Sequence, residues 1–123
     1  MSVREVVYYA DSRGRYPVLE ELEELTSDER KKILAYITLL EEEGEMLRRP
    51  IADYVGDKLY ELRPKAHRVL YFFYLREYVV ILHLFRKKTE ALPERQRQIA
   101  LGRMRDIIQR AKEGKISFGG GLR

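Results

Sequence analysis

The chain has 123 residues, of which 45% are hydrophobic and 36% are charged, as expected for one globular domain with its own core. It contains no cysteine, which excludes disulfides, thiolate–zinc sites and thiol chemistry, and its two histidines are too few for a histidine-rich metal cage. No apolar run reaches the ~18 residues of a membrane span, and the N-terminus lacks the apolar core of a secretory signal. We therefore expect a cytoplasmic protein that does not bind membranes.

Charge is distributed unevenly along the chain. Residues 1–56 hold 8 Lys and Arg against 13 Asp and Glu, a net charge of −5, whereas residues 57–123 hold 16 against 7, a net charge of +9. A contrast of this size indicates that the basic part of the domain faces a polyanion. For the acidic part, solvated helix faces are the simpler interpretation.

The first quarter of the sequence predicts a strand followed by a short helix. The segment Val3–Ala10 is rich in Val and Tyr, as strands are. Pro17 fits the first turn of a helix that begins near Val18. The apolar residues expected to face the core from this helix are Leu19, Leu22 and Leu25.

A second helix has clearer boundaries. Thr26 and Glu29 have the spacing of a capping box, in which each side chain accepts a hydrogen bond from an otherwise unpaired backbone N–H. Gly44 can adopt the left-handed conformation that ends a helix. The buried positions are predicted to be Ile33, Ile37 and Leu40, with Tyr36 beside them.

The period then changes from helical to extended. Leu59–Arg63 predicts a short strand, and the segments His67–Leu75 and Tyr78–Phe85 are apolar, β-branched and aromatic. Only Arg76 and Glu77 separate these last two segments. This link favours an antiparallel hairpin, because a parallel crossover needs a dozen residues or more. Since both strands are apolar on both faces, we expect helices on one face and partial cover on the other.

Pro93 opens a last helix that ends near Gly114, and the following segment Lys115–Arg123 is glycine-rich. The buried residues of this helix are predicted to be Ala100, Met104, Ile107 and Ala111. The prediction is therefore one α+β domain over residues 1–114 with a flexible tail at 115–123. Its elements follow the order β-α-α-β-β-β-α, with a small, mainly antiparallel sheet, a helical hairpin and a C-terminal helix.

Cationic side chains gather at the ends of the predicted strands. Arg63 ends the first of these strands, Arg68 begins the second, and Arg86, Lys87 and Lys88 end the third. In an antiparallel hairpin the start of one strand lies beside the end of the other, so Arg68 should lie close to residues 86–88. Because four or five converging cations repel one another, we expect an anion to occupy this place. Arginine offers a bidentate fork for phosphate, and lysine a point charge.

Three aromatic residues lie near these cations in sequence, namely Tyr60, Tyr71 and Tyr74. Cations that bind phosphates and rings that stack on bases together favour RNA as the ligand. In the alternative interpretation, Arg63 or Arg68 pairs with an acid such as Glu61 and the tyrosines belong to the core.

The two histidines have different surroundings in sequence. His83 lies among apolar residues and is interpreted as a core residue. His67 begins a strand next to Arg68 and could be exposed, which makes it the better candidate for a general acid or base.

The segment Gly56–Thr89, with LYELR, RVLYFF and ILHLFRKKT, is followed by Pro93 and a helix containing Ala100. This combination resembles the RelE/HigB-like toxins of bacterial toxin–antitoxin pairs, most closely their phage-derived, HigB-type branch. The resemblance implies an mRNA interferase that cuts messenger RNA, commonly on the translating ribosome, without a metal or cofactor. It also implies a toxin–antitoxin hetero-oligomer with a HigA-like antitoxin that carries a helix-turn-helix DNA-binding domain.

Position by position, Arg63 of LYELR, Arg68 of RVLYFF, and Lys87 and Lys88 of FRKKT match the basic positions of that family. The resulting assignment is Arg68, Lys87 and Lys88 for catalysis, and Arg63, Lys65 and Arg86 for RNA binding. Three features depart from the family pattern, and the first is that Arg86 extends the lysine pair to a basic triplet. His67 stands where small or polar residues are more usual, and the glycine-rich tail has no counterpart.

The expected mechanism joins the basic cluster to the family. The ribose 2′-OH attacks its own 3′-phosphate, while Lys87 or Lys88 takes or stabilises the 2′-OH proton and Arg63 and Arg68 stabilise the phosphoryl charge. The acid that protonates the leaving 5′-oxygen is left open between His67, Tyr71 and the second lysine.

Two other functions remain open at this point. The first is a non-catalytic RNA- or ribosome-binding module with a toxin-like fold, and the second is a structural domain whose basic edge docks an acidic protein. The enzyme and the RNA- or ribosome-binding module both predict salt-sensitive RNA binding, and the structural domain does not. Only the enzyme creates new RNA 5′ ends.

Overall fold

The computed structural model describes residues 3–116 of the chain. Its helices and strands are β1 (Glu5–Tyr8), α1 (Pro17–Glu23), α2 (Ser27–Glu43), the one-turn helix η1 (Gly44–Met46), β2 (Ala52–Gly56), β3 (Leu59–Leu62), β4 (His67–Tyr74), β5 (Tyr78–Arg86) and α3 (Glu94–Lys112). The predicted α+β class is confirmed. The predicted order lacked one strand, β2.

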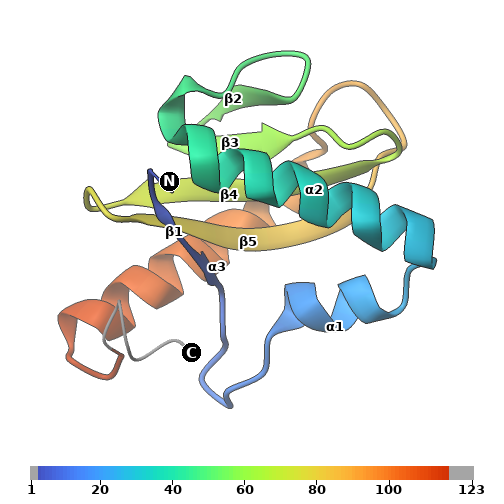
Figure 1. Ribbon diagram of the computed structural model, residues 1–123. Coiled ribbons are helices and arrows are strands. Elements are labelled where there is room, and N and C mark those ends of the chain that lie inside the picture. The colour runs from blue at the N-terminus through green and yellow to red at the C-terminus, as the bar shows by residue number, and fades with distance from the viewer. Residues whose placement is uncertain (1–2, 117–123) are drawn as a thin grey trace.

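All five strands form one sheet in the spatial order β1-β5-β4-β3-β2. The pairs β2–β3, β3–β4 and β4–β5 are antiparallel, and β1 adds to the edge of β5 in parallel. The hairpin predicted between β4 and β5 is confirmed. Figure 1 shows α1 and α2 on one side of this sheet and α3 on the other.

The helical hairpin begins and ends where the sequence indicated. Pro17 is the first residue of α1. Thr26 caps α2 with both bonds of a capping box: its Oγ1 accepts from the N–H of Glu29 at 3.2 Å, and the Glu29 carboxylate accepts from the N–H of Thr26 at 3.1 Å. Gly44 ends α2 at φ +55°, a backbone conformation that favours glycine.

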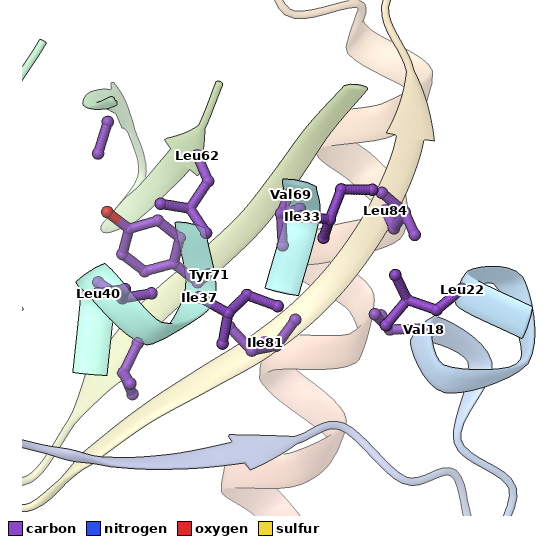
Figure 2. Close-up of a cluster of buried hydrophobic side chains, with 12 residues drawn as sticks. Val18, Leu22, Ile33, Ile37, Leu40, Leu62, Val69, Tyr71, Ile81 and Leu84 are labelled. Carbon is purple, nitrogen blue, oxygen red and sulfur yellow. The ribbon is translucent and has the colours of Figure 1, made fainter. Parts of the chain in front are cut away.

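Two apolar clusters hold the layers together, one on each face of the sheet. In the first, Ile33, Ile37 and Leu40 of α2 pack on Tyr71 and Ile81 of the sheet, as Figure 2 shows. The second lies under α3 and is built by Ala100, Met104 and Ile107 against Leu70, Phe72, Val80 and Leu82. Burial on both faces explains why β4 and β5 read as nearly continuous apolar runs.

The strand that sequence reasoning missed, β2, pairs with β3 through an unusual turn. Asp57 and Lys58 connect the two strands, and both have positive φ, +56° and +65°. Hairpins of this type are normally signalled by Asn-Gly or Asp-Gly at these two positions. With Asp-Lys in their place, and with an irregular register between Tyr54 and Gly56, the sequence offered no hairpin signal.

The orientation of α1 also differs from the prediction. Val18 and Leu22, four residues apart, are buried, whereas Leu19 is 37% exposed. The helical period of 3.6 places residues i and i+4 on one face, so Val18 is buried together with Leu22. The prediction, based on a spacing of three, had paired Leu19 with Leu22. Among residues 3–116, no helix is long and apolar enough to cross a membrane.

Most of the predicted glycine-rich tail, from residue 117 on, lies outside the described residues. Its first two residues are part of the fold. The Lys115 N–H donates to the carbonyl of Arg110 at 2.9 Å, and Ile116 packs against the α3-side apolar cluster.

Candidate functional site

The hairpin β4–β5 brings the predicted basic positions together at one end of the sheet. His67 lies opposite Arg86 and Arg68 opposite Phe85, and the Lys87 N–H donates to the carbonyl of Ala66 at 2.7 Å. In Figure 1 this is the end where β5 runs into the loop that leads to α3. The start of β4 and the end of β5 thus lie side by side, as the hairpin predicted.

The pleat of the sheet, however, divides the cations between two faces. Arg86 points to the α2 side, where its guanidinium contacts the Glu29 carboxylate at 2.7 Å. Arg68 and Lys87 belong to the α3 side, because successive side chains of a strand alternate between faces. The expectation of a single cluster is therefore wrong for Arg86.

Arg68 is 5% exposed, and hydrogen bonds to backbone carbonyls hold its guanidinium in place. Its Nη1 donates to the carbonyls of Lys65 at 2.9 Å and His67 at 2.8 Å. Burial lowers the pKa of Arg68, and the nearby charge of Arg63 lowers it further. Its Nε and Nη2 have no hydrogen-bond partner among residues 3–116, and neither atom is buried, so these N–H donors remain available to a ligand.

The other two cations of this face share one carboxylate. Glu90 contacts Lys87 Nζ at 2.5 Å and Arg63 Nη2 at 3.7 Å, although its own side chain is 76% exposed. Hydrogen bonding to Lys87 lowers the pKa of Glu90, and the charges of Arg63 and Arg68 lower it further. The anion expected among converging cations is thus supplied in this structure by the chain itself. The only feature of the sequence that could have indicated this ion pair is the spacing of three residues between Lys87 and Glu90.

Arg63 also has the partner that the alternative interpretation named. Its Nη1 contacts the buried carboxylate of Glu61 at 2.5 Å. A further cation that sequence reasoning missed, Arg49, is close enough to lower the pKa of Arg68 and is paired with Asp53 at 3.0 Å. We define the phosphate-site cluster as Arg63, Arg68 and Lys87.

Lys65 and Lys88 are exposed and lie next to this cluster in the chain. Lys65, at φ +55°, occupies the tip of the β3–β4 loop. Neither ammonium group has an ion pair within the described part of the chain. Their proposed roles in RNA binding and catalysis remain predictions.

Tyr71 belongs to the core. It is 1% exposed, packs in the α2-side cluster, and stacks on Tyr60 with ring centroids 5.6 Å apart. Burial raises the pKa of its hydroxyl. Because Tyr71 lies on the face opposite Arg68, it can neither stack on a base at the phosphate-site cluster nor donate a proton there.

The histidines are both buried. His83 is 5% exposed, with Nε2 2.5 Å from Gln96 Oε1 and Nδ1 3.4 Å from Arg103 Nη1, which confirms its assignment to the core. His67, the better candidate of the two for a general acid or base, is only 4% exposed and lies on the α2 side with Arg86. The fold therefore separates His67 from the phosphate-site cluster.

Within residues 3–116, no three His, Asp or Glu side chains gather into a set that could hold a metal ion. What the phosphate-site cluster offers is positive charge and N–H donors around one exchangeable anion. Cations and N–H donors of this kind are the groups with which proteins bind phosphate.

A family model described as Phage derived protein Gp49-like (DUF891) matches residues 20–105, well over half of the chain. The chain belongs to this family. The Gp49-like proteins are a family of RelE/HigB-type toxins. The matched region contains the whole phosphate-site cluster together with Glu90. Among curated proteins, none matches the chain.

Proposed function

We propose that the protein is the toxin of a toxin–antitoxin pair and acts as an mRNA interferase, cutting messenger RNA on the translating ribosome. Membership in the Gp49-like family supports the toxin role. The observation that carries the catalytic part is the phosphate-site cluster, in which Arg63 and Lys87 contact a single exposed carboxylate, Glu90, and Arg68 lies close enough to lower the pKa of that carboxylate.

In the proposed reaction, the ribose 2′-oxygen attacks the adjacent phosphorus and the bond from phosphorus to the 5′-oxygen breaks. The products are a 2′,3′-cyclic phosphate and a 5′-hydroxyl. Arg63 and the available N–H donors of Arg68 stabilise the charge on the phosphoryl oxygens. One of Lys87 and Lys88, as the neutral amine, accepts the 2′-OH proton, and the other, as the ammonium, donates a proton to the leaving 5′-oxygen. The substrate supplies its own nucleophile, so the reaction requires no metal ion.

The proposed partner is an antitoxin of the HigA-like, helix-turn-helix type, which forms a hetero-oligomer with the toxin. Because charge is distributed unevenly along the toxin, the antitoxin could bind in either of two places. An acidic segment would cover the phosphate-site cluster, whereas a basic one would bind the acidic helices.

The function is tested by primer extension on messenger RNA from bacteria before and shortly after expression of this protein alone. We expect growth arrest and new 5′ ends inside coding regions. These ends should disappear when translation is blocked before induction, since the ribosome presents the substrate. Unchanged messenger ends in cells that contain the folded protein would contradict the enzyme and favour the non-catalytic binding module.

The position of Glu90 leads to a further prediction. In the proposed complex the substrate phosphate binds Arg63 and Lys87, which Glu90 contacts in the free protein, so RNA must displace the Glu90 carboxylate. We expect Glu90→Gln to tighten the binding of single-stranded RNA about fivefold at 0.1 M salt, the effect of about one additional phosphate contact. Fluorescence anisotropy with a labelled RNA that carries 2′-O-methyl groups measures this binding without cleavage.

Glu77→Gln is the matched control, because it removes the same charge at the opposite end of the β4–β5 hairpin. It should change the affinity less than twofold. Unchanged affinity in Glu90→Gln would show that Glu90 does not compete with phosphate. A loss of cleavage by 100-fold or more, together with tighter binding, would instead make Glu90 the general base.

A further inference from the structure

A cavity of about 570 Å³ lies on the α2 side of the sheet, between the first turns of α2 and the β3–β4 loop. The loop contributes Pro64, Lys65 and Ala66, and α2 contributes Lys31, Lys32 and Ala35. Alanine and proline side chains give the cavity apolar walls, and lysines surround them. Neither the proposed reaction nor the apolar core uses this cavity.

The charge around this cavity is positive. None of its three lysines has a carboxylate partner within residues 3–116. Of the two acids that line it, Glu29 is already bound by Arg86 at 2.7 Å and by the backbone N–H of Thr26. Asp28 alone is left to offset the lysines, so the cavity favours an anionic ligand.

His67 lines the same cavity and has no hydrogen bond from its ring to any described residue. The residue is 4% exposed, yet neither ring nitrogen is among the buried unsatisfied atoms, so the imidazole keeps contact with the cavity. A nearly buried side chain with free donor and acceptor capacity is uncommon. The imidazole of His67 is therefore suited to form a hydrogen bond with the edge of a polar, planar ligand that enters the cavity.

The cavity and the phosphate-site cluster lie on the two sides of the same loop. Lys65 takes part in both, because its side chain lines the cavity while its carbonyl accepts a hydrogen bond from Arg68 Nη1 at 2.9 Å. Figure 1 shows the β3–β4 loop at the same end of the molecule as the start of α2. A strand of nucleic acid that crosses this loop can reach both places.

We propose that this cavity is a nucleotide subsite for the RNA substrate, which holds a base across the β3–β4 loop from the scissile phosphate. The base lies between Ala35, Pro64 and Ala66 and is hydrogen-bonded by His67, while Lys31, Lys32 and Lys65 bind the flanking phosphates. The subsite rests on the proposed function, since its ligand is the RNA that the phosphate-site cluster cleaves. It would give the enzyme a preference for the base at one position near the cut.

The test compares the full chain with the variant Lys31→Ala/Lys32→Ala in binding a fluorescein-labelled, 2′-O-methylated single-stranded RNA dodecamer. If each lysine contacts one phosphate, the slope of log K against log salt becomes less steep by about 1.4, and affinity falls about 25-fold at 0.1 M salt. Both lysines are exposed, so the variant should fold. Circular dichroism checks this directly.

The matched control is Arg105→Ala/Lys112→Ala, which removes two exposed cations from α3. It should alter the affinity less than twofold. A second readout locates the RNA: a dodecamer containing 4-thiouridine should cross-link to the peptide 64–67 or to the first turns of α2.

Three results would overturn the subsite. If the α2 variant binds RNA as the control does while Arg68→Ala weakens binding, the RNA takes another path and the proposed function stands. If the unmodified chain does not bind RNA at all, the subsite and the proposed function both fail. If an acidic polypeptide such as poly-glutamate, and not RNA, binds in a manner that depends on Lys31 and Lys32, the cavity is a protein-docking site.

Discussion

Replacing Arg68 by alanine is expected to lower the rate of messenger RNA cleavage by about 100- to 1,000-fold, as the loss of a preorganised donor to a reacting oxyanion does. Two carbonyls hold Nη1 in place, while Nε and Nη2 remain available. Because the guanidinium is already held in position, it needs to move little when charge develops on a phosphate. The measurement is single-turnover cleavage of messenger RNA in a translation reaction.

Two further variants make the result specific. Arg68→Lys keeps the charge but loses the planar fork, so it should recover only part of the rate. Arg105→Ala, which removes an exposed arginine from α3, should stay within twofold of the unmodified protein. The double variant Arg68→Ala/Lys87→Ala should lose nearly all cleavage.

Thermal unfolding of each variant separates a catalytic loss from a folding loss. Arg68 is buried, so its removal also leaves the carbonyls of Lys65 and His67 without their donor. Full cleavage by a folded Arg68→Ala/Lys87→Ala protein would refute the assignment of both residues.

Replacing Tyr71 by alanine is expected to lower the free energy of unfolding by about 3–5 kcal/mol, the range for deleting a buried aromatic ring. Tyr71 is 1% exposed and makes ring contacts with Tyr60 and Phe73 at centroid distances of 5.6 and 5.7 Å. For a domain of this size the midpoint of thermal unfolding should fall by roughly 10 to 20 °C. Urea unfolding followed by circular dichroism measures the free energy directly.

Tyr54→Ala provides the control for this prediction, because the same ring is removed from an edge strand where it is 54% exposed. Its cost should stay below about 1 kcal/mol. Tyr71→Phe keeps the ring and should retain both stability and cleavage. Loss of cleavage in a stable Tyr71→Phe protein would contradict the placement of Tyr71 away from the reaction.

Local chemistry predicted most element boundaries correctly. The capping box acts through hydrogen bonds between Thr26 and Glu29. Gly44, Pro17 and Pro93 act through the backbone φ that each allows or fixes, so all of these signals are local in the chain. The strands β4 and β5 were equally recognisable, because apolar β-branched and aromatic runs suit a sheet covered on both faces. The strand β2 was missed because Asp57 and Lys58 adopt positive φ without the usual residues of such a turn.

The candidate site was predictable only in part. The hairpin follows from the sequence, and it brings the start of β4, with Arg68, beside the end of β5, with Lys87. Which cations share a face could not be inferred, because one residue of slip in a strand exchanges its two faces. The irregular register between Leu70 and Tyr71 adds to this uncertainty. The exposure of His67 depends on α2, because this helix packs over the start of β4. The two elements are far apart in the sequence, so the contact could not be inferred from it.

The sequence by itself determined the α+β class, the hairpin and the presence of a basic strand end, since each depends on composition, period or residues close in the chain. Only the tertiary structure decided that Glu90 closes the phosphate-site cluster, that Arg86 pairs with Glu29, and that a lysine-lined cavity opens beside His67. These contacts join the β3–β4 loop, α2 and the segment after β5. Their geometry depends on how the layers pack around the sheet, and no local propensity encodes that packing.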